Sequence, residues 1–229
     1  MKNLPRTKPQ ILASKIYTIL KQAYPHAKCG LNFSNEYELL VATILSAQCT
    51  DQRVNLVLPQ LFSCCPDLAT LAQTKLTKIQ ELIRSVGLYQ NKAKNLKALA
   101  QTLAAQNFVI PRQLKELIKL PGVGRKTANV VLSNAWGLAE GIAVDTHVQR
   151  ITQILGLSKH QDPLKIEQDL MRLFPPAQWG EISHLIITLG RQVCQARRPA
   201  CARCPLATLR LAGCRKKIGR GDRQGKTRP

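Results

Sequence analysis

The chain is poor in aromatic residues and in acidic residues, and it has no long apolar run. Aromatic residues make up 4% of its 229 residues, which argues against a surface that stacks the bases of single-stranded nucleic acid. No segment approaches the roughly 20 apolar residues that span a membrane, and the first residues, MKNLPRTKPQ, lack the apolar run of a secretory signal. We therefore expect an intracellular protein without a membrane partner.

The shortage of acidic residues leaves a strongly basic chain. Asp and Glu number 13 against 34 Lys and Arg, a formal net charge of +21. Such an excess favours a polyanionic partner, most commonly nucleic acid, although it can also serve solubility. With so few aromatic residues, binding to the backbone of a duplex is the better interpretation.

Apolar residues recur at helical spacing along almost the whole chain. In ILASKIYTILKQAY, five of them fall on one stripe, and similar stripes recur in YELLVATILSAQ and ISHLIITLGRQV. The pattern predicts an all-α protein of about nine or ten helices. The last segment, RKKIGRGDRQGKTRP, has little to bury, so residues 215–229 are expected to form a disordered basic tail.

Half of the eight cysteines lie in CQARRPACARCPLATLRLAGC, residues 194–214. In a reducing compartment, clustered cysteines more often bind metal than form disulfides. A four-cysteine site suggests zinc first, but zinc sites usually pair two C-x2-C units and only one is present. The others, Cys29, Cys49, Cys64 and Cys65, are expected to be small buried side chains.

The string LPGVG interrupts two helical patterns in RQLKELIKLPGVGRKTANVVLSNAW. Gly122 and Gly124 are expected to adopt positive φ and to allow a close approach of another backbone. The amides at the start of the next helix, together with its dipole, would then bind a phosphate oxygen. A plain tight turn between two helices is the alternative.

Three strings, LPGVGRKTA, VDTH at 144–147 and LSAQCTD at 45–51, occur in the order and spacing of a known family. With them the chain, from about residue 10 to 214, resembles the helix-hairpin-helix glycosylases, and most closely the endonuclease III family. The resemblance implies two helical lobes with a central cleft. One lobe would be residues 29–139, barrel-like and carrying the hairpin, and the other residues 1–28 with 140–214.

Lys126 and Asp145 are the candidate catalytic residues. Lys126 falls in the first helical turn beside Arg125, where the helix N-terminus, the neighbouring charge and partial burial all disfavour an ammonium ion and so favour a nucleophilic amine. The alternative role is a phosphate-binding cation. Asp145 is well placed as a helix N-cap, whereas the resemblance makes it the essential carboxylate opposite Lys126. His147, two residues on, is expected to be a hydrogen-bonded structural histidine.

An enzyme that acts on a base in a duplex must flip the nucleotide and fill the space it leaves. The resemblance assigns this filling to Gln48, which faces the orphaned partner base, and to the apolar wedge Leu88. Gly122, Gly124 and Arg125 are the other expected DNA contacts. Taken singly, Gln48 would be an amide at a helix end and Leu88 a core leucine.

The resemblance also implies a [4Fe-4S] cluster bound by cysteines spaced C-x6-C-x2-C-x5-C. Cys194, Cys201 and Cys204 fit the first two intervals, but Arg210 stands at the fourth position, and the next cysteine is Cys214. Arginine is not a ligand of a cluster iron. We favour Cys214 as the fourth ligand; three-cysteine ligation and loss of the cluster are the alternatives. The arginines around these cysteines would contact DNA phosphates.

The expected function is that of a bifunctional DNA glycosylase and abasic-site lyase that removes damaged, oxidised pyrimidines from duplex DNA. The enzyme would act as a monomer in the cytoplasm or nucleoid, with no requirement for Mg²⁺. A related glycosylase specific for adenine or for pyrimidine dimers is one alternative, although Lys126 argues against the adenine branch. A non-catalytic iron-sulfur module that binds DNA or senses redox state is another.

Overall fold

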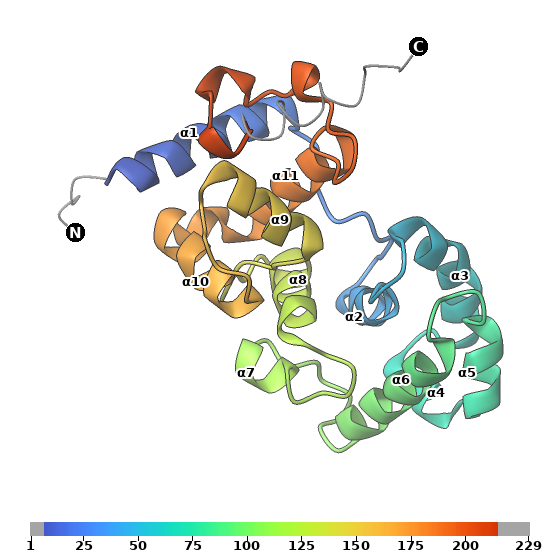
Figure 1. Ribbon diagram of the computed structural model, residues 1–229. Coiled ribbons are helices and arrows are strands. Elements are labelled where there is room, and N and C mark those ends of the chain that lie inside the picture. The colour runs from blue at the N-terminus through green and yellow to red at the C-terminus, as the bar shows by residue number, and fades with distance from the viewer. Residues whose placement is uncertain (1–6, 215–229) are drawn as a thin grey trace, which may run out of the picture. The chain divides into compact units, whose positions relative to one another are not determined.

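The computed structural model describes residues 7–214, and every regular element in that range is helical (Figure 1). The all-α class is therefore confirmed, with eleven α-helices where nine or ten were expected. Within the same range, none of the helices combines the length and the apolarity needed to cross a bilayer. The basic tail expected at 215–229 lies outside the described residues.

The chain divides into two compact units. One comprises residues 29–140, and the other comprises the chain before and after that segment. The helices of the first unit are α2 (Glu36–Leu45), α3 (Asp51–Cys64), α4 (Leu68–Gln73), α5 (Leu76–Leu82), α6 (Tyr89–Ala104), α7 (Leu114–Leu117) and α8 (Arg125–Trp136). Those of the second are α1 (Lys8–Ala23), α9 (Thr146–Leu155), α10 (Pro163–Leu173) and α11 (Trp179–Gln192), with short 3₁₀ turns at Pro176–Gln178, Cys201–Arg203 and Ala207–Leu209.

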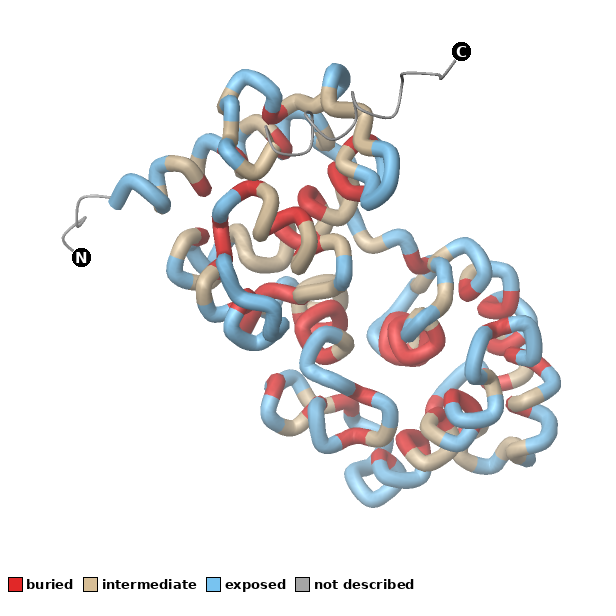
Figure 2. Tube along the Cα trace, in the orientation of Figure 1, coloured by how far each residue is buried: buried red, intermediate tan, exposed pale blue. Residues whose placement is uncertain are grey.

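Helix α2 forms the centre of the unit 29–140. Its sequence, EYELLVATIL, is apolar on nearly all sides, and eight of its ten residues are buried (Figure 2). A helix with this composition can be stable only inside a core. The helices α3, α6 and α8 pack against it. The helices α2 and α8 are therefore parts of the same packed core.

In the second unit, the first helix of the chain packs against α10 and α11. Its apolar stripe is buried less completely than its spacing suggests. Ile16 and Leu20 are fully buried and join the core around Ile151 and Leu185, whereas Ile11 is 45% exposed. The stripe is wider than the face that α10 and α11 cover, so its first turn remains in solvent.

The turn between α7 and α8 depends on one of its two glycines. Gly122 has φ +77°, and a Cβ placed there would lie 3.0 Å from Cβ of Asn95 on α6. Gly124, in contrast, has φ −86° and extended backbone as the N-cap of α8, so the expectation of a positive φ there was wrong. One left-handed residue is enough to reverse the chain, and the next glycine serves as a cap.

We predict that Gly122→Ala destabilises the protein more than Gly137→Ala. Gly137, at the other end of α8, also has positive φ (+67°) but nothing lies within 4 Å of an added Cβ. Gly137→Ala should therefore cost only the left-handed backbone, about 1–2 kcal/mol. Gly122→Ala should cost a further ~1–3 kcal/mol from the contact with Asn95. Thermal and urea unfolding measure both, and equal destabilisation would contradict the close packing.

Candidate active site and metal centre

Lys126 is the second residue of α8, and its side chain is exposed. The partial burial expected for it was therefore wrong, because α8 enters the core only from its second turn, at Ala128 to Leu132, and its first turn stays exposed. The N-cap of α8 is Gly124, which has no side chain to accept hydrogen bonds from the first-turn amides. The start of this helix thus presents Arg125 and Lys126 to solvent beside its positive end.

Asp145 is the N-cap of α9, as its place in the sequence predicts. Its Oδ1 accepts a hydrogen bond of 2.8 Å from the amide of Val148, and the residue is half-buried. The bond uses one carboxylate oxygen and leaves Oδ2 available for chemistry. Asp145 belongs to the second unit, whereas Lys126 belongs to the unit 29–140.

His147 differs from its expected role as a hydrogen-bonded histidine. Its Nδ1 is buried and has no hydrogen-bond partner within residues 7–214. The ring packs against Gly190 of α11, where an added Cβ would lie 2.9 Å from Nδ1. A helical glycine has room for the ring but has no side chain to accept a hydrogen bond.

Gln48 and Leu88 lie in two exposed turns that approach each other. Both have left-handed backbone, with φ 52° and 58°, which is uncommon for residues other than glycine. Leu88, the N-cap of α6, is 57% exposed and so is not the core leucine of the alternative interpretation. The two turns are neighbours. A Cβ built on Gly87, the residue before Leu88, would lie only 3.7 Å from the carbonyl oxygen of Gln48.

Two basic residues outside the predicted site, Lys92 and Arg150, bind backbone carbonyls next to the candidate residues. Lys92 Nζ donates to the carbonyl oxygen of Leu45 at 2.9 Å, and Arg150 Nη1 donates to that of Cys194 at 2.6 Å. Burial lowers the pKa of Lys92 from its ordinary value, although the nearby Cys49 thiol acts in the opposite direction. The sequence signal for Lys92 was its place on the apolar stripe of α6.

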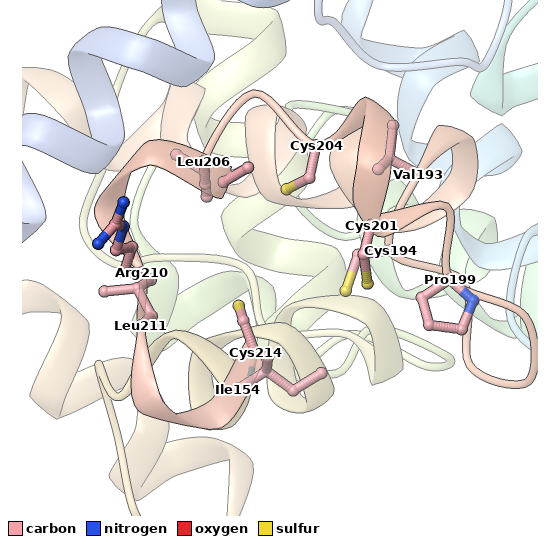
Figure 3. A pocket seen from close by; sticks show the side chains of 11 residues that line it. Ile154, Val193, Cys194, Pro199, Cys201, Cys204, Leu206, Arg210, Leu211 and Cys214 are labelled. Carbon is pink, nitrogen blue, oxygen red and sulfur yellow. The ribbon is translucent and has the colours of Figure 1, made fainter. Parts of the chain in front are cut away.

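The four C-terminal cysteines line one cavity of about 410 Å³. Their sulfur atoms point into the same space, with Arg210 at its edge (Figure 3). Burial raises the pKa of the Cys204 thiol, and the nearby Cys194 and Cys201 thiols act in the same direction. The other lining residues are Ile154, Val193, Pro199, Leu206, Ala207 and Leu211.

The position of Cys214 at this cavity depends on the glycine before it, Gly213, which packs closely against another segment of the chain. A Cβ on Gly213 would lie 2.1 Å from the carbonyl oxygen of Ile154, near the end of α9, so no other residue fits there without moving the backbone. Arg210 has left-handed backbone, φ 46°, directly after the turn Ala207–Leu209. The longer interval after Cys204 is thus folded so that Cys214, four residues beyond Arg210, lines the cavity.

No set of three or more His, Cys, Asp or Glu side chains in the described part of the chain is arranged to hold a single metal ion. Cysteines around a cubane are bound to four different irons and so lie farther apart than the ligands of one zinc.

The other four cysteines are less buried than expected. Only Cys65 is fully buried, whereas Cys29, Cys49 and Cys64 are half-buried.

The sequence matches a known class of repair protein. The family model described as HhH-GPD superfamily base excision DNA repair protein matches residues 41–176, which include the hairpin, Lys126 and Asp145. The chain therefore belongs to the HhH-GPD superfamily of base excision DNA repair proteins.

Within that superfamily the chain belongs to the endonuclease III family, which confirms the resemblance. It is 50% identical to endonuclease III of Synechocystis sp. over 198 residues, 86% of this chain and 90% of the relative. It is 46% identical to that of Bacillus subtilis over 188 residues, 81% and 85% of the two chains. A solved non-covalent endonuclease III–DNA complex superimposes with a TM-score of 0.86 at 40% identity, covering 93% of this chain and 99% of that one.

We predict that Asp145 stabilises α9 as an ordinary N-cap, a role that asparagine can also fill. Asp145→Asn keeps a cap and should change the free energy of unfolding by only a few tenths of a kcal/mol, whereas Asp145→Ala should cost about 1 kcal/mol. Asp162, which caps α10 with a bond of 2.9 Å from the amide of Lys165, is a matched control. Urea unfolding of Asp145→Asn, Asp145→Ala, Asp162→Asn and Asp162→Ala measures this, and a large loss in Asp145→Asn alone would contradict a simple cap.

Proposed function

We propose that this chain is a bifunctional DNA N-glycosylase and abasic-site lyase that removes damaged, oxidised pyrimidines from duplex DNA. The observation that carries the proposal is the exposed Lys126 at the start of α8, where Gly124 leaves the helix without a side-chain cap. In a member of the endonuclease III family, this places an amine next to a site suited to a DNA phosphate. The enzyme would work where its DNA lies, in the nucleoid.

Lys126 would act as the nucleophile. The lone pair of Nζ attacks C1′ of the deoxyribose, and the C1′–N glycosidic bond breaks as the base leaves with that bonding pair and takes a proton. The C1′–O4′ bond of the sugar then breaks, O4′ keeps the bonding pair and takes a proton, and an iminium forms between Nζ and C1′. The iminium acidifies the C2′ proton, and its removal expels the 3′ phosphate as the C3′–O bond breaks. Water then releases Lys126, and no Mg²⁺ is required.

Asp145 would supply the carboxylate. With Oδ1 accepting from the amide of Val148, the same group can take the proton that Lys126 loses before attack. It can also stabilise the positive charge that develops on the sugar as the base departs. The cap therefore fixes the orientation of a group whose second oxygen acts on the deoxyribose.

The DNA would be bound through its backbone and opened by a wedge. Gly122 and Gly124 allow a phosphate to approach the amides at the start of α8, and Arg125 adds charge, without reading sequence. Gln48 and Leu88, exposed in adjacent turns, would fill the space of the flipped nucleotide. Arg197, Arg198 and Arg203 are exposed on the cysteine loop and would contact further phosphates.

A [4Fe-4S] cluster would be held by Cys194, Cys201, Cys204 and Cys214, which line one cavity. When bound, it would cross-link the loop after α11 and so serve a structural role. The hydrogen bond from Arg150 to the carbonyl oxygen of Cys194 ties this loop to α9, the helix that Asp145 caps. The cysteine loop would thus be ordered next to the DNA-binding arginines.

We expect borohydride to trap the parent covalently on a duplex with an abasic site, because it reduces the imine at Lys126. Lys126→Ala should lose trapping and strand cleavage, by at least about 10³-fold. Lys119→Ala is the control, since Lys119 is an exposed lysine on the same hairpin, paired with Glu116 at 2.9 Å. Asp145→Asn should also lose activity, and Asp162→Asn should not. Full trapping by Lys126→Ala would remove Lys126 as the nucleophile.

We expect Cys214→Ser to lower the iron content and the visible absorbance of the purified protein, because one iron would lose its thiolate. Cys64→Ser, which changes a half-buried cysteine outside the cavity, should leave both unchanged. Iron analysis and the rate of bleaching in air are the measurements. A Cys214→Ser protein with a full and equally stable cluster would show that another group completes the site.

A further inference from the structure

A buried lysine lies on the apolar side of α6. Lys92 is 4% exposed and occupies the same face as Leu96, Leu99 and Leu103, which are fully buried. An ammonium group in such a place is costly unless it is hydrogen-bonded. The proposed mechanism of base removal makes no use of it.

The partner of Lys92 is a helix end. Its Nζ donates to the carbonyl oxygen of Leu45 at 2.9 Å, the last residue of α2, where carbonyls lack partners within the helix and a positive charge is favourable. The backbone amide of Lys92 donates to the carbonyl oxygen of Leu88 at 3.1 Å. That backbone bond is the ordinary i→i−4 bond at the start of α6, which any residue at this position would make. The bond specific to the lysine is the one to Leu45, which lies three residues before Gln48 on the helix that leads into the other turn.

Both turns need such support. Gln48 and Leu88 have left-handed backbone, a conformation that residues other than glycine keep only where the surroundings hold them. The two turns are close enough that a Cβ on Gly87 would lie 3.7 Å from the carbonyl oxygen of Gln48. Cys49, next to Gln48, is near enough to Lys92 to raise the pKa of Lys92, against the larger lowering by burial.

We propose that Lys92 is a positioning residue that holds Gln48 and Leu88 together as one rigid element for insertion into the duplex. The proposal rests on the proposed function, because it takes Gln48 and Leu88 as the residues that enter the DNA. Lys92 itself touches neither the substrate nor the reacting atoms. Its bond to Leu45 fixes the end of α2 relative to the start of α6, and thereby fixes the spacing of the two inserting side chains.

The test compares Lys92→Met with Lys97→Met. Lys97 lies on the same helix and also binds carbonyls, those of Ala72 at 3.0 Å and Thr74 at 2.6 Å, at the end of α4 and away from the two turns. Both variants replace a lysine with an unbranched apolar side chain and lose bonds of the same kind. Lys97→Met thus controls for the general cost of removing a lysine from this helix.

Insertion is read out directly. 2-Aminopurine next to a tetrahydrofuran abasic analogue becomes brighter when a side chain disrupts its stacking, and the analogue cannot form an imine. With the full chain at saturating concentration, Lys92→Met should lose at least half of this increase and Lys97→Met should keep it. Single-turnover removal of an oxidised pyrimidine should slow by about tenfold to a hundredfold in Lys92→Met, as expected for a misplaced group.

A double-mutant cycle tests whether Lys92 acts through the wedge. If it does, adding Lys92→Met to Leu88→Ala should slow base removal little further, within about twofold, because the interaction is already lost. If the effects multiply instead, Lys92 does not act through Leu88 and the proposal is wrong. Should Lys92→Met fail to give a cooperative thermal transition, Lys92→Gln, which keeps an N–H donor but loses the charge, replaces it in the same comparisons.

The two proposals fail differently. If the parent protein is not trapped by borohydride on an abasic duplex, the proposed function fails. If the parent is trapped and Lys92→Met gives the same fluorescence increase and the same rate of base removal as Lys97→Met, only the role of Lys92 is overturned.

Discussion

The unpaired backbone groups at helix ends are the constraint on which this structure depends. Each α-helix leaves amides at its start and carbonyls at its end without partners, and a chain of many short helices has many such ends. Several helix starts are satisfied by an N-cap side chain: Asn35, Thr50 and Asp67 cap α2, α3 and α4. The candidate functional residues Lys126 and Asp145 also lie at helix starts, one without a side-chain cap and one with a carboxylate cap.

Three of these ends correspond to three parts of the proposed reaction. The start of α8 has a glycine as its N-cap, which suits it to phosphate and places Lys126 beside it. The start of α9 is capped by a carboxylate that keeps one oxygen for chemistry. The end of α2 is bonded by the buried ammonium of Lys92. In the proposed reaction, folding and function would thus use the same hydrogen-bonding groups.

Patterns of sequence predicted the helical class, the hairpin and the cap at Asp145, because helical period, glycine and N-cap chemistry act over a few residues. Burial was harder to predict. The exposure of Ile11 and Lys126 and the missing partner of His147 depend on how wide a face the neighbouring helices cover, which local spacing does not contain. Gly124 was misjudged because one left-handed residue, Gly122, suffices for the turn. The contact of Gly213 with Ile154 joins segments almost sixty residues apart, beyond any local pattern.

The left-handed turns of Gln48 and Leu88 have a consequence for how a repair enzyme searches. A flexible loop that orders only on contact with DNA loses conformational entropy at every encounter, including the many with undamaged base pairs. If Gln48 and Leu88 insert as proposed, the ordering would occur once, during folding, because the buried hydrogen bond of Lys92 and the neighbouring turn would fix the conformation beforehand. For a wedge built this way, the time spent at each base pair would be set by the opening of the DNA itself. Weakly paired lesions would then be distinguished from undamaged pairs because they open more easily.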